Sequence, residues 1–348
     1  MTALPPPQNS ASVLIDRHHE ANAEPPREHM GCSLLGHPCD RYLWLSFRHA
    51  VQEQFSGRML RLFRRGQNEE SVVVSDLRAI GVDVQATGAS QSRVKFDCHV
   101  SGSVDGIIES GLPESPKKRH ILEIKTYNRK SFDKLTKDGV QKTKFQHYVQ
   151  MQLYMLGTGI DRAFYIAICK DSDEIYTERI RFDKGMAEKY LERGKRIALA
   201  ERMPEPLSAD PSWYQCQYCP AHSMCFAKEP TKCVNCRTCA HSTPKPDSTW
   251  RCERHQADGI PVEWQRKGCD SHVIHPDMVP WQQKDGLDEW TAVYEIDGKD
   301  VANGAPRSGV YSSAELLANP ALCASGHQFV EAVRERFGGR VVARSCYD

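Results

Sequence analysis

Cysteine clustering constrains the fold of this chain more than any other feature of its sequence. Eight of the 14 cysteines lie between Cys216 and Cys269 in a chain of 348 residues, and several form C-x2-C pairs. The sequence opens without the basic and then apolar stretch of a signal peptide, so a secreted disulfide framework is not expected. C-x2-C pairs in a long chain are typical of metal binding. Metal-binding thiols in turn predict a reducing cytoplasm as the location.

The cysteine-rich segment divides the chain into predicted parts. Residues 1–30 are expected to form a flexible leader, and residues 31–228 a domain with regular helix and strand periodicities. Residues 229–280 have few periodic runs, as is usual for a module whose small core is held by metal. Residues 281–348 regain patterning and predict a small C-terminal α+β region, with a hairpin at Asp297-Gly298 and a final helix that ends at glycine.

The long domain predicts an α/β fold with a mixed central sheet flanked by helices. Apolar residues recur every three or four positions from Met59 to Ile80, which predicts one long helix closed by Gly81. Further helices are expected in KFQHYVQMQLYML and KGMAEKYLERGKRIALAERM. Strands are expected in VDVQA, RVKFDCHV, SGSVDGIIE, HILEIKTYN, AFYIAICK and IYTERIRF. This order of helices and strands is typical of a mixed sheet covered by helices.

Charged residues interrupt these apolar patterns at four positions. Glu70 lies in the apolar stripe of the long helix, Asp105 lies in an apolar strand, and Glu123 and Lys125 share one face of the next strand. Buried carboxylates are costly unless they are paired, and two neighbouring ones repel each other. A divalent cation such as Mg2+ resolves this conflict and indicates phosphoryl chemistry, in which Lys125 would orient or deprotonate water or neutralise charge.

These residues resemble the core motif of the PD-(D/E)XK nucleases, which is carried here by Asp105, 17 intervening residues and Glu123-Ile124-Lys125. FRRGQNEE resembles the first-motif helix of that family and supplies Glu70. The resemblance implies a restriction-endonuclease-like core in which Glu70, Asp105, Glu123 and the Ile124 carbonyl hold Mg2+ or Mn2+. It also implies that Lys125 is catalytic.

Two further details of the resemblance concern the helices. Glu69 is the alternative to Glu70 as the acidic residue of the first motif. QMQLYM resembles the Q-x3-Y motif of the RecB-like branch, carried by Gln150 and Tyr154. The resemblance implies that Gln150 positions substrate or water and that Tyr154 contributes to substrate binding.

Local charge agrees with a nucleic-acid substrate. The formal net charge is only +1, so the chain as a whole does not attract polyanions. Residues 117–144 nevertheless hold ten Lys or Arg and three acidic residues. A solvated loop is the ordinary interpretation of such a run, but this one adjoins the candidate site and is predicted to contact phosphates. The predicted contacts are Lys117, Lys118, Arg119, Arg129 and Lys130.

The first cysteine set is C-x2-C-x5-C, formed by Cys216, Cys219 and Cys225, and Cys39 is its expected fourth member with Cys32 as the alternative. A distant N-terminal cysteine combined with this motif resembles the iron–sulfur nuclease branch, which includes AddB and the RecB-like CRISPR-associated exonucleases. The resemblance implies a [4Fe-4S] cluster that closes the nuclease domain. Zinc remains open, because four thiolates also suit tetrahedral Zn2+.

The second cysteine set predicts a structural zinc site. Cys236 and Cys239 would form a turn, and Cys252 and Cys269 would close the loop, as in zinc ribbons. Cys233, His255 and His272 are alternative ligands. Four protein ligands leave no open position, so the role is structural.

Together these patterns predict a metal-dependent DNA nuclease, more an exonuclease than an endonuclease, that acts at DNA ends or on single strands. GHPCDRYLWLSFR resembles phage-encoded exonucleases, which implies replication, recombination or repair in a bacterial or phage-infected cell. DNA is the expected partner, with recombination or replication proteins as further expected partners. No apolar run is long enough to cross a bilayer. The alternatives are a zinc-containing DNA-binding protein with an inactive nuclease core and an iron–sulfur redox sensor.

Overall fold

A five-stranded mixed sheet forms the centre of the larger lobe in a computed structural model that describes residues 10–326, 328–339 and 341. Strands β6 and β7 are parallel, and all other neighbours in this sheet are antiparallel. In spatial order the strands are β2 (Asp83–Gln85), β5 (Gly106–Ser110), β6 (His120–Tyr127), β7 (Arg162–Cys169) and β8 (Ile175–Arg181). The prediction of a mixed sheet flanked by helices is confirmed.

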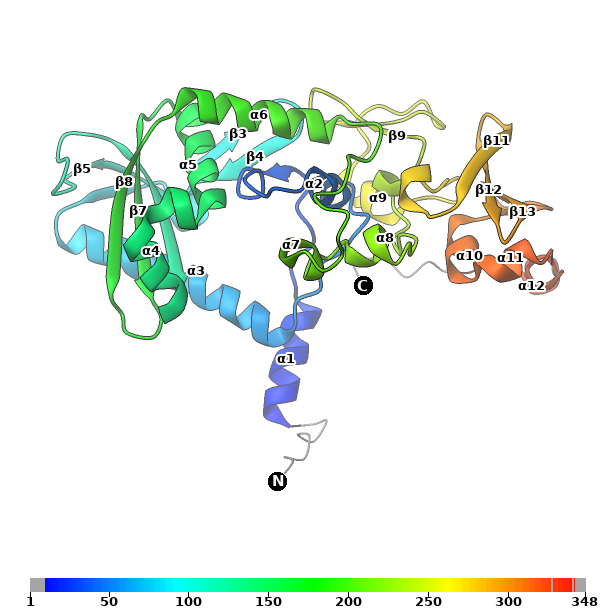
Figure 1. Cartoon of the computed structure of the whole chain (residues 1–348), viewed down its shortest axis with the longest axis horizontal. Coiled ribbons are helices and arrows are strands. Elements are labelled where there is room, and N and C mark those ends of the chain that lie inside the picture. The colour runs from blue at the N-terminus through cyan, green and yellow to red at the C-terminus, as the bar shows by residue number, and fades with distance from the viewer. Residues whose placement is uncertain (1–9, 327, 340, 342–348) are drawn as a thin grey trace.

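Helices cover both faces of this sheet (Figure 1). On one face, α3 (Gly57–Ala79) packs its last turns against Leu122 and Ile124 of β6. On the other face lie α4 (Arg129–Thr143) and α5 (Phe145–Thr158), and α6 (Lys184–Ala198) packs against α5. Because strand side chains alternate, β6 presents Leu122 and Ile124 to α3, and Ile121 and Glu123 to α5.

The prediction of a flexible leader is wrong for residues 11–21, which form helix α1 (Ala11–Ala21) beside the start of α3. A Cβ on Gly57 would lie 2.4 Å from Asp16 Cα, and the Gly57 N–H donates to Glu20 at 2.7 Å. Helix α1 buries no side chain, so it has no apolar stripe that the sequence could reveal. Residues 1–9 of the predicted leader lie outside the described residues.

The two ends of the predicted nuclease domain meet in the centre of the molecule. Helix α2 (Asp40–Phe47) lies beside α7 (Tyr214–Gln217) and α8 (His222–Phe226). Trp44 Nε1 donates to the Ala200 carbonyl at 2.8 Å, and Arg193 Nε of α6 donates to Asp40 at 2.8 Å. A second small sheet holds β1 (Met30–Gly31), β4 (Val100–Ser103) and β3 (Arg93–Lys95).

The cysteine-rich segment packs directly on this centre. It contains β9 (Ser242–Pro244), β10 (Trp250–Cys252) and α9 (Val262–Lys267). Trp250 is fully buried against Phe47 of α2, and both belong to an apolar core that continues to Tyr294 in the C-terminal region. The predicted parts of the chain therefore share a core and are not separately packed.

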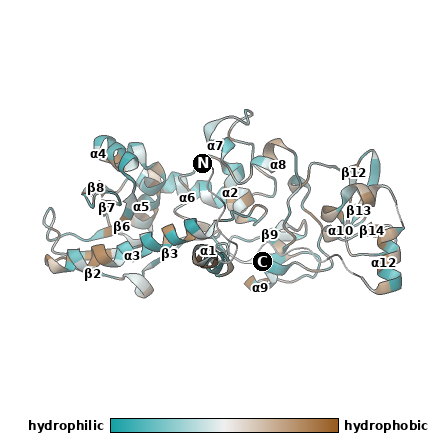
Figure 2. Cartoon of the chain, turned by 90° about the horizontal axis from the view of Figure 1, so that it is seen from below, coloured by the Kyte–Doolittle hydropathy of each residue, from teal (hydrophilic) through white to brown (hydrophobic). Residues whose placement is uncertain are grey.

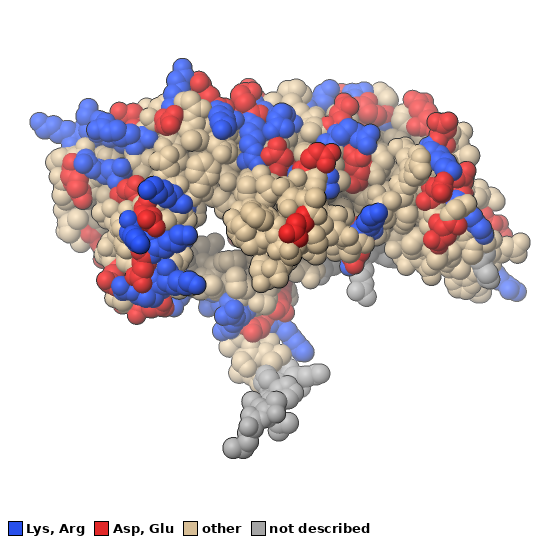
Figure 3. Space-filling model, viewed as in Figure 1, with Lys and Arg blue, Asp and Glu red and all other residues tan. Residues whose placement is uncertain are grey.

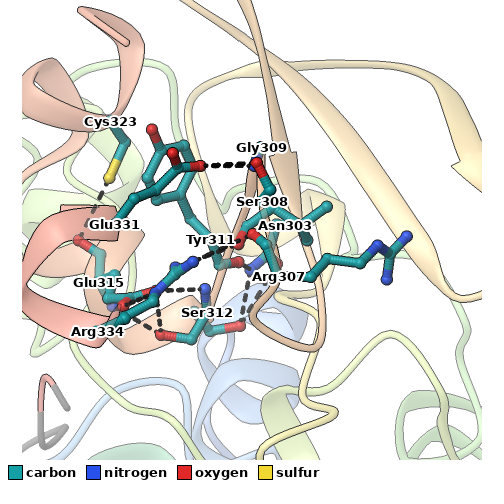
Figure 4. A network of polar contacts seen from close by, with 12 residues as sticks. Asn303, Arg307, Ser308, Gly309, Tyr311, Ser312, Glu315, Cys323, Glu331 and Arg334 are labelled. Atoms are coloured by element: carbon teal, nitrogen blue, oxygen red, sulfur yellow. Dashed lines mark hydrogen bonds and ion pairs between the residues drawn. The ribbon is translucent and has the colours of Figure 1, made fainter. Parts of the chain in front are cut away.

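The C-terminal region is a sheet with three short helices. Its strands are β11 (Gln282–Asp288), β12 (Thr291–Ile296), β13 (Lys299–Asn303) and β14 (Val310–Tyr311), and its helices are α10 (Ser313–Ala318), α11 (Pro320–Ala324) and α12 (Phe329–Phe337). The β12–β13 hairpin turns at Asp297 and Gly298, which both have positive φ. Figure 4 shows Arg334 of α12 reaching the Glu315 carboxylate of α10.

Hydropathy alternates along the helices, as Figure 2 shows for α3 and α4. Within the described residues, no helix combines the length and the apolar character needed to cross a membrane.

Candidate active site

Asp105, Glu123 and Lys125 come together where β5 and β6 run side by side. The antiparallel register of these strands places Asp105, one residue before β5, beside Glu123. The Ile124 N–H donates to Asp105 Oδ2 at 2.9 Å, which fixes the Asp105 carboxylate against β6. Lys125 Nζ lies 2.5 Å from Glu123 Oε1 and 3.6 Å from Asp105 Oδ2. The motif therefore forms one contiguous polar cluster.

Oxygen atoms surround the Lys125 ammonium as they would surround a metal cation. Besides the two carboxylates, the Ile124 carbonyl accepts a hydrogen bond from Lys125 Nζ at 3.0 Å. The Glu123 side chain is 0% exposed, and its Oε1 contacts the Lys125 ammonium. A buried carboxylate oxygen, a second carboxylate and a backbone carbonyl are the hard donors that Mg2+ and Mn2+ prefer. The residues present fit such a cation.

Burial dominates the electrostatics of this cluster. It raises the pKa of Glu123 to about 8, because Lys125 lowers that pKa less than burial raises it. Burial alone would lower the pKa of Lys125, but Glu123 and Asp105 raise it well above its usual value. Lys125 therefore keeps its proton and acts as a cation in this arrangement.

Glu70 approaches the cluster from α3. Burial, together with Asp105, raises the pKa of its half-buried carboxyl to about 7. Gly66 lies one turn earlier, where an added Cβ would be 3.9 Å from Thr126 Oγ1 of β6, so α3 runs close to the strand here. Glu70 therefore lies near enough to Asp105 and Lys125 to interact with both electrostatically.

Gln150 and Tyr154 lie behind Glu123, one turn apart on α5. Gln150 Nε2 donates to Glu123 Oε2 at 3.2 Å and to the Tyr154 hydroxyl at 3.1 Å. Tyr154 is only 3% exposed and packs beside Gly102 and Cys32. A side chain buried this deeply cannot contact DNA, so the prediction that Tyr154 binds substrate is corrected. Tyr154 supports Gln150, and Gln150 orients Glu123.

Sequence reasoning missed a group of aromatic and basic residues on the same face. The Tyr127 hydroxyl contacts the Tyr165 hydroxyl at 2.6 Å and His147 Nδ1 at 3.0 Å. Burial, and then Lys125, lowers the pKa of His147 to about 3, so the imidazole is neutral. Lys144 Nζ lies 4.0 Å from the centre of the Tyr127 ring. The position of Tyr127 two residues after Lys125 was the available signal, since both point to one face.

The predicted phosphate contacts fall into two groups at opposite ends of β6. Lys117, Lys118 and Arg119 precede the strand, and Arg129 and Lys130 follow it, so roughly 25 Å separates the groups. Arg119 forms a bidentate ion pair with Glu109, and Arg129 pairs with Asp133 and Glu174. The three lysines of these groups, Lys117, Lys118 and Lys130, are exposed. One continuous basic patch around the site is therefore not formed by these residues.

A hollow lies beside the site. Figure 3 shows the surface hollowed between the lobe that carries α4, where Lys and Arg gather among acidic residues, and a largely uncharged surface at the place of α7 in Figure 1. Helix α4 starts four residues after Lys125, and α3 passes β6 at Gly66. Strand β6, which carries Glu123 and Lys125, therefore packs against both helices.

The first cysteine set is gathered at the far side of this hollow. Burial, together with the thiols of Cys39, Cys225 and Cys216, raises the pKa of Cys219 to about 11. Cys39 also caps helix α2, and its sulfur accepts from Tyr42 N at 3.4 Å. Cys32, the alternative to Cys39, is instead buried in the core beside Gly102.

The second cysteine set lines one small cavity, together with His255 and His272. The cavity brings together Cys236, Cys239, Cys252 and Cys269. Cys269 Sγ lies 3.8 Å from His255 Nε2. His272 contacts Ser313 Oγ and the Asn235 carbonyl, and Cys233 does not line the cavity. In the part of the chain that the structure describes, no three His, Cys, Asp or Glu side chains converge closely enough to hold a metal ion as they stand.

A mixed sheet that brings Asp105, Glu123 and Lys125 into contact defines a nuclease core. The chain belongs to the PD-(D/E)XK nuclease superfamily, because the model of this superfamily matches residues 14–226. No curated protein matches the chain.

Solved structures similar to this chain have low identity to it. The structure of SSO0001 is 15% identical, with a TM-score of 0.41, over 64% of this chain and 98% of that chain. LHK-Exo, an alkaline exonuclease from Laribacter hongkongensis seen in complex with dAMP, is 16% identical, with a TM-score of 0.37, over 53% and 89%. A phage related exonuclease from Haemophilus somnus is 21% identical, with a TM-score of 0.27, over 37% and 65%.

Proposed function

We propose that this nuclease is a Mg2+- or Mn2+-dependent deoxyribonuclease that works as an exonuclease at DNA ends or on single strands. The observation that carries the proposal is the Lys125 ammonium held among Asp105, Glu123 and the Ile124 carbonyl, with contacts of 2.5 to 3.6 Å. Asp105, Glu123, the Ile124 carbonyl and Glu70 are the proposed ligands of the cation. A bound divalent cation polarises the phosphate and activates water for attack on it.

The protein's own groups supply positioning and charge. Gln150 holds Glu123 Oε2, so the other oxygen of that carboxylate stays directed toward Lys125. Lys125 keeps its proton and is placed to orient water or to neutralise charge on the phosphate. Neutral His147 and the two tyrosine hydroxyls around it add a fixed polar wall without adding charge.

The exonuclease assignment is supported by the RecB-like features of the sequence. The Gln150–Tyr154 pair and the distant cysteine Cys39 accompany that branch, in which ends or single strands are the substrates. Replication, recombination or repair in the cytoplasm of a bacterial or phage-infected cell is the proposed setting. Recombination or replication proteins are the proposed further partners.

Both cysteine sets are proposed to hold metal. The first set suits a [4Fe-4S] cluster or zinc, and the second suits structural zinc. Iron, sulfide and zinc should be quantified in anaerobically purified Cys39→Ser, Cys252→Ser and Cys98→Ser variants. We expect Cys39→Ser to lose the metal of the first set, Cys252→Ser to lose zinc, and Cys98→Ser, outside both sets, to keep both. Full metal content in Cys39→Ser would remove Cys39 from the ligands.

The decisive experiment compares wild type with Lys125→Ala on end-labelled single-stranded and duplex DNA, with Mg2+ or Mn2+. We expect the variant to lose at least about 100-fold in rate, because charge stabilisation at a transition state is worth this much. Lys299→Ala, at the exposed start of β13, is the matched control and should cut normally. Closed circular DNA separates the two modes of cutting, since an exonuclease leaves it intact. Equal cutting by wild type and Lys125→Ala would remove Lys125 from the mechanism.

A further inference from the structure

Three exposed aromatic side chains surround the short helix α7. Trp213, Tyr214 and Tyr218 are 44%, 64% and 83% exposed and lie within six positions of one another. The Trp213 and Tyr214 rings contact each other, with centroids 5.1 Å apart. Single exposed apolar residues are ordinary on protein surfaces, but a local group of large aromatic rings marks an interaction site.

The backbone beneath these rings is well anchored. Trp213 O accepts from Cys216 N at 2.8 Å and from Gln217 N at 2.9 Å, and Cys219 N donates to Cys216 O at 3.0 Å. The Cys216 side chain is buried within the first cysteine set. The rings are therefore presented from a turn that the cysteine group fixes, so little backbone entropy is lost when a ligand stacks on them.

A basic helix, α4, lies across the hollow from α7. Figure 1 and Figure 2 place α4 and α7 at the same level with a space between them, and Figure 3 shows the surface hollowed there, with Lys and Arg on the α4 side. The exposed lysines of α4 are Lys130, Lys134, Lys137 and Lys142. The carboxylate and lysine cluster around Lys125 lies at the base of α4.

A polyanion with exposed bases fits this surface. Lysines bind phosphates, and aromatic rings stack on bases, which is the combination that single-stranded nucleic acid uses. Duplex DNA keeps its base faces inside the helix, except at its ends, and offers little to the rings of α7. The lysines of α4 together with the aromatic rings at α7 therefore favour single-stranded over duplex DNA.

We propose that Trp213, Tyr214 and Tyr218 form a stacking platform that binds the bases of a single DNA strand on its way to the Lys125 site. The inference rests on the proposed deoxyribonuclease function and assigns its substrate as single-stranded. The rings act on binding and on the choice of strand, and they do not touch the reacting phosphate.

Binding of fluorescein-labelled oligo-dT of about 20 nucleotides to the full-length protein, without added Mg2+, tests this directly. We expect the triple variant Trp213→Ala, Tyr214→Ala and Tyr218→Ala to bind oligo-dT at least tenfold more weakly and a duplex of equal length unchanged. Tyr214→Phe and Tyr218→Phe keep the rings and should bind like wild type. Phe337→Ala removes a ring that is 76% exposed elsewhere and is the matched control.

Any other result of these binding measurements overturns the proposed stacking platform. Unchanged oligo-dT binding by the triple variant removes it, and so does an equal loss for oligo-dT and duplex or a full loss in the Phe variants. Cleavage assays on the same proteins separate this failure from failure of the nuclease. If wild type cuts DNA but the triple variant binds normally, the platform is wrong and the nuclease stands. If wild type does not cut but the triple variant loses oligo-dT binding, the nuclease is wrong and the platform stands.

Discussion

At the scale of single residues, Glu123 is the carboxylate of the site whose burial is most costly, because its side chain is fully buried. Its side chain is fully buried between the Lys125 ammonium and the Gln150 amide. Such a carboxylate is tolerated only with good partners on both oxygens. The structure supplies a cation on one oxygen and an oriented amide on the other, so Gln150 tunes the site without facing solvent.

Gln150→Ala should therefore lower the rate of cutting by roughly tenfold or more, and it should also lower stability, because it leaves Glu123 Oε2 buried without its donor. Gln152→Ala is the matched control on the same helix, because Gln152 bonds to backbone at Arg181 O and Asp183 N and not to Glu123. We expect Gln152→Ala to lower the melting temperature as well, but to leave the rate of the folded enzyme nearly unchanged. An equal fall of kcat in the two variants, with thermal unfolding measured alongside, would make Gln150 purely structural.

The carboxyls of Glu70 and Glu123 should make metal binding at the site depend on pH. Its pKa is raised to about 7 and that of Glu123 to about 8, above their ordinary value of 4.5. Protons therefore compete with a cation for these carboxylates near neutral pH. We predict that the Mg2+ concentration for half-maximal activity rises as pH falls from 9 to 6, and that added Mg2+ restores activity at pH 6. Glu70→Gln should weaken this dependence. An Mg2+ requirement that is independent of pH would contradict the assignment.

The raised pKa values of Glu70 and Glu123 also make the stability of the fold depend on pH. The folded protein without metal binds these protons more tightly than the unfolded chain, so its stability falls as pH rises from about 4.5 toward 8. Bound Mg2+ should remove this loss, and thermal unfolding with and without Mg2+ across this pH range measures the difference.

At the scale of elements, hydrophobic periodicity predicted the helices and strands that bury an apolar face. It did not predict where a turn interrupts a strand. The long helix α3, the strands β5 to β8, α5 and α6 all carry apolar faces, and the sequence revealed them. The run RVKFDCHV was expected to form one strand, but Cys98 and His99 both have positive φ and split it into β3 and β4. No residue type in that run signals such a turn, since neither position is glycine.

The catalytic cluster was predictable for a similar reason, because carboxylates in apolar runs stand out. Tyr154 was misjudged because a motif position says nothing about burial. Its depth follows from the close approach of Gly102, where an added Cβ would lie 2.7 Å from the Tyr154 ring. The Tyr127–His147–Tyr165 contacts join three separate elements, and only the fold shows that these meet.

The short turn between Cys236 and Cys239 packs against α2, and this packing can be tested. Arg237 in this turn is 2% exposed and donates to Phe47 O at 3.0 Å, to Gln265 Oε1 at 2.9 Å and to Glu28 O at 2.8 Å. Its guanidinium also lies over the Phe47 and Trp250 rings. The turn therefore fastens the cysteine-rich module to α2.

We predict that Arg237→Met costs at least about 3 kcal/mol, because it removes three hydrogen bonds from a charged donor. Arg237→Lys should recover little, since an ammonium lacks the planar fork. The control is Arg251→Met, which breaks ion pairs with the exposed Asp258 and half-buried Glu253 and a hydrogen bond to Gln256, all of them contacts that solvent screens. Chemical unfolding of the metal-loaded proteins measures all three, and equal losses for Arg237→Met and Arg251→Met would contradict the docking role.

At the scale of the whole molecule, a single core joins parts that the sequence suggested were separate. Trp250 of the cysteine-rich module and Tyr294 of the C-terminal sheet belong to the core that also holds Trp44 of α2. The C-terminal region thus rests on the module, which rests on the nuclease core, and Figure 1 places α10 to α12 and the five-stranded sheet at opposite ends of the molecule. Loosening the C-terminal region should therefore leave cutting intact.

Glu315 offers a way to loosen the C-terminal region and to test whether cutting stays intact. Burial alone would raise the pKa of Glu315, but hydrogen bonds from Arg334 and Ser312 lower it overall (Figure 4). A carboxyl whose folded pKa is depressed stabilises the fold above its unfolded value of 4.5, and that contribution is lost as pH falls further. We predict that Glu315→Gln exposes α10 to α12 to hydrogen exchange at pH 7 as acid does in wild type. Glu335→Gln, on the exposed side of α12, should have no effect, and cutting at pH 7 should be unchanged in both. A loss of cutting in Glu315→Gln alone would show that the C-terminal region communicates with the site through the shared core.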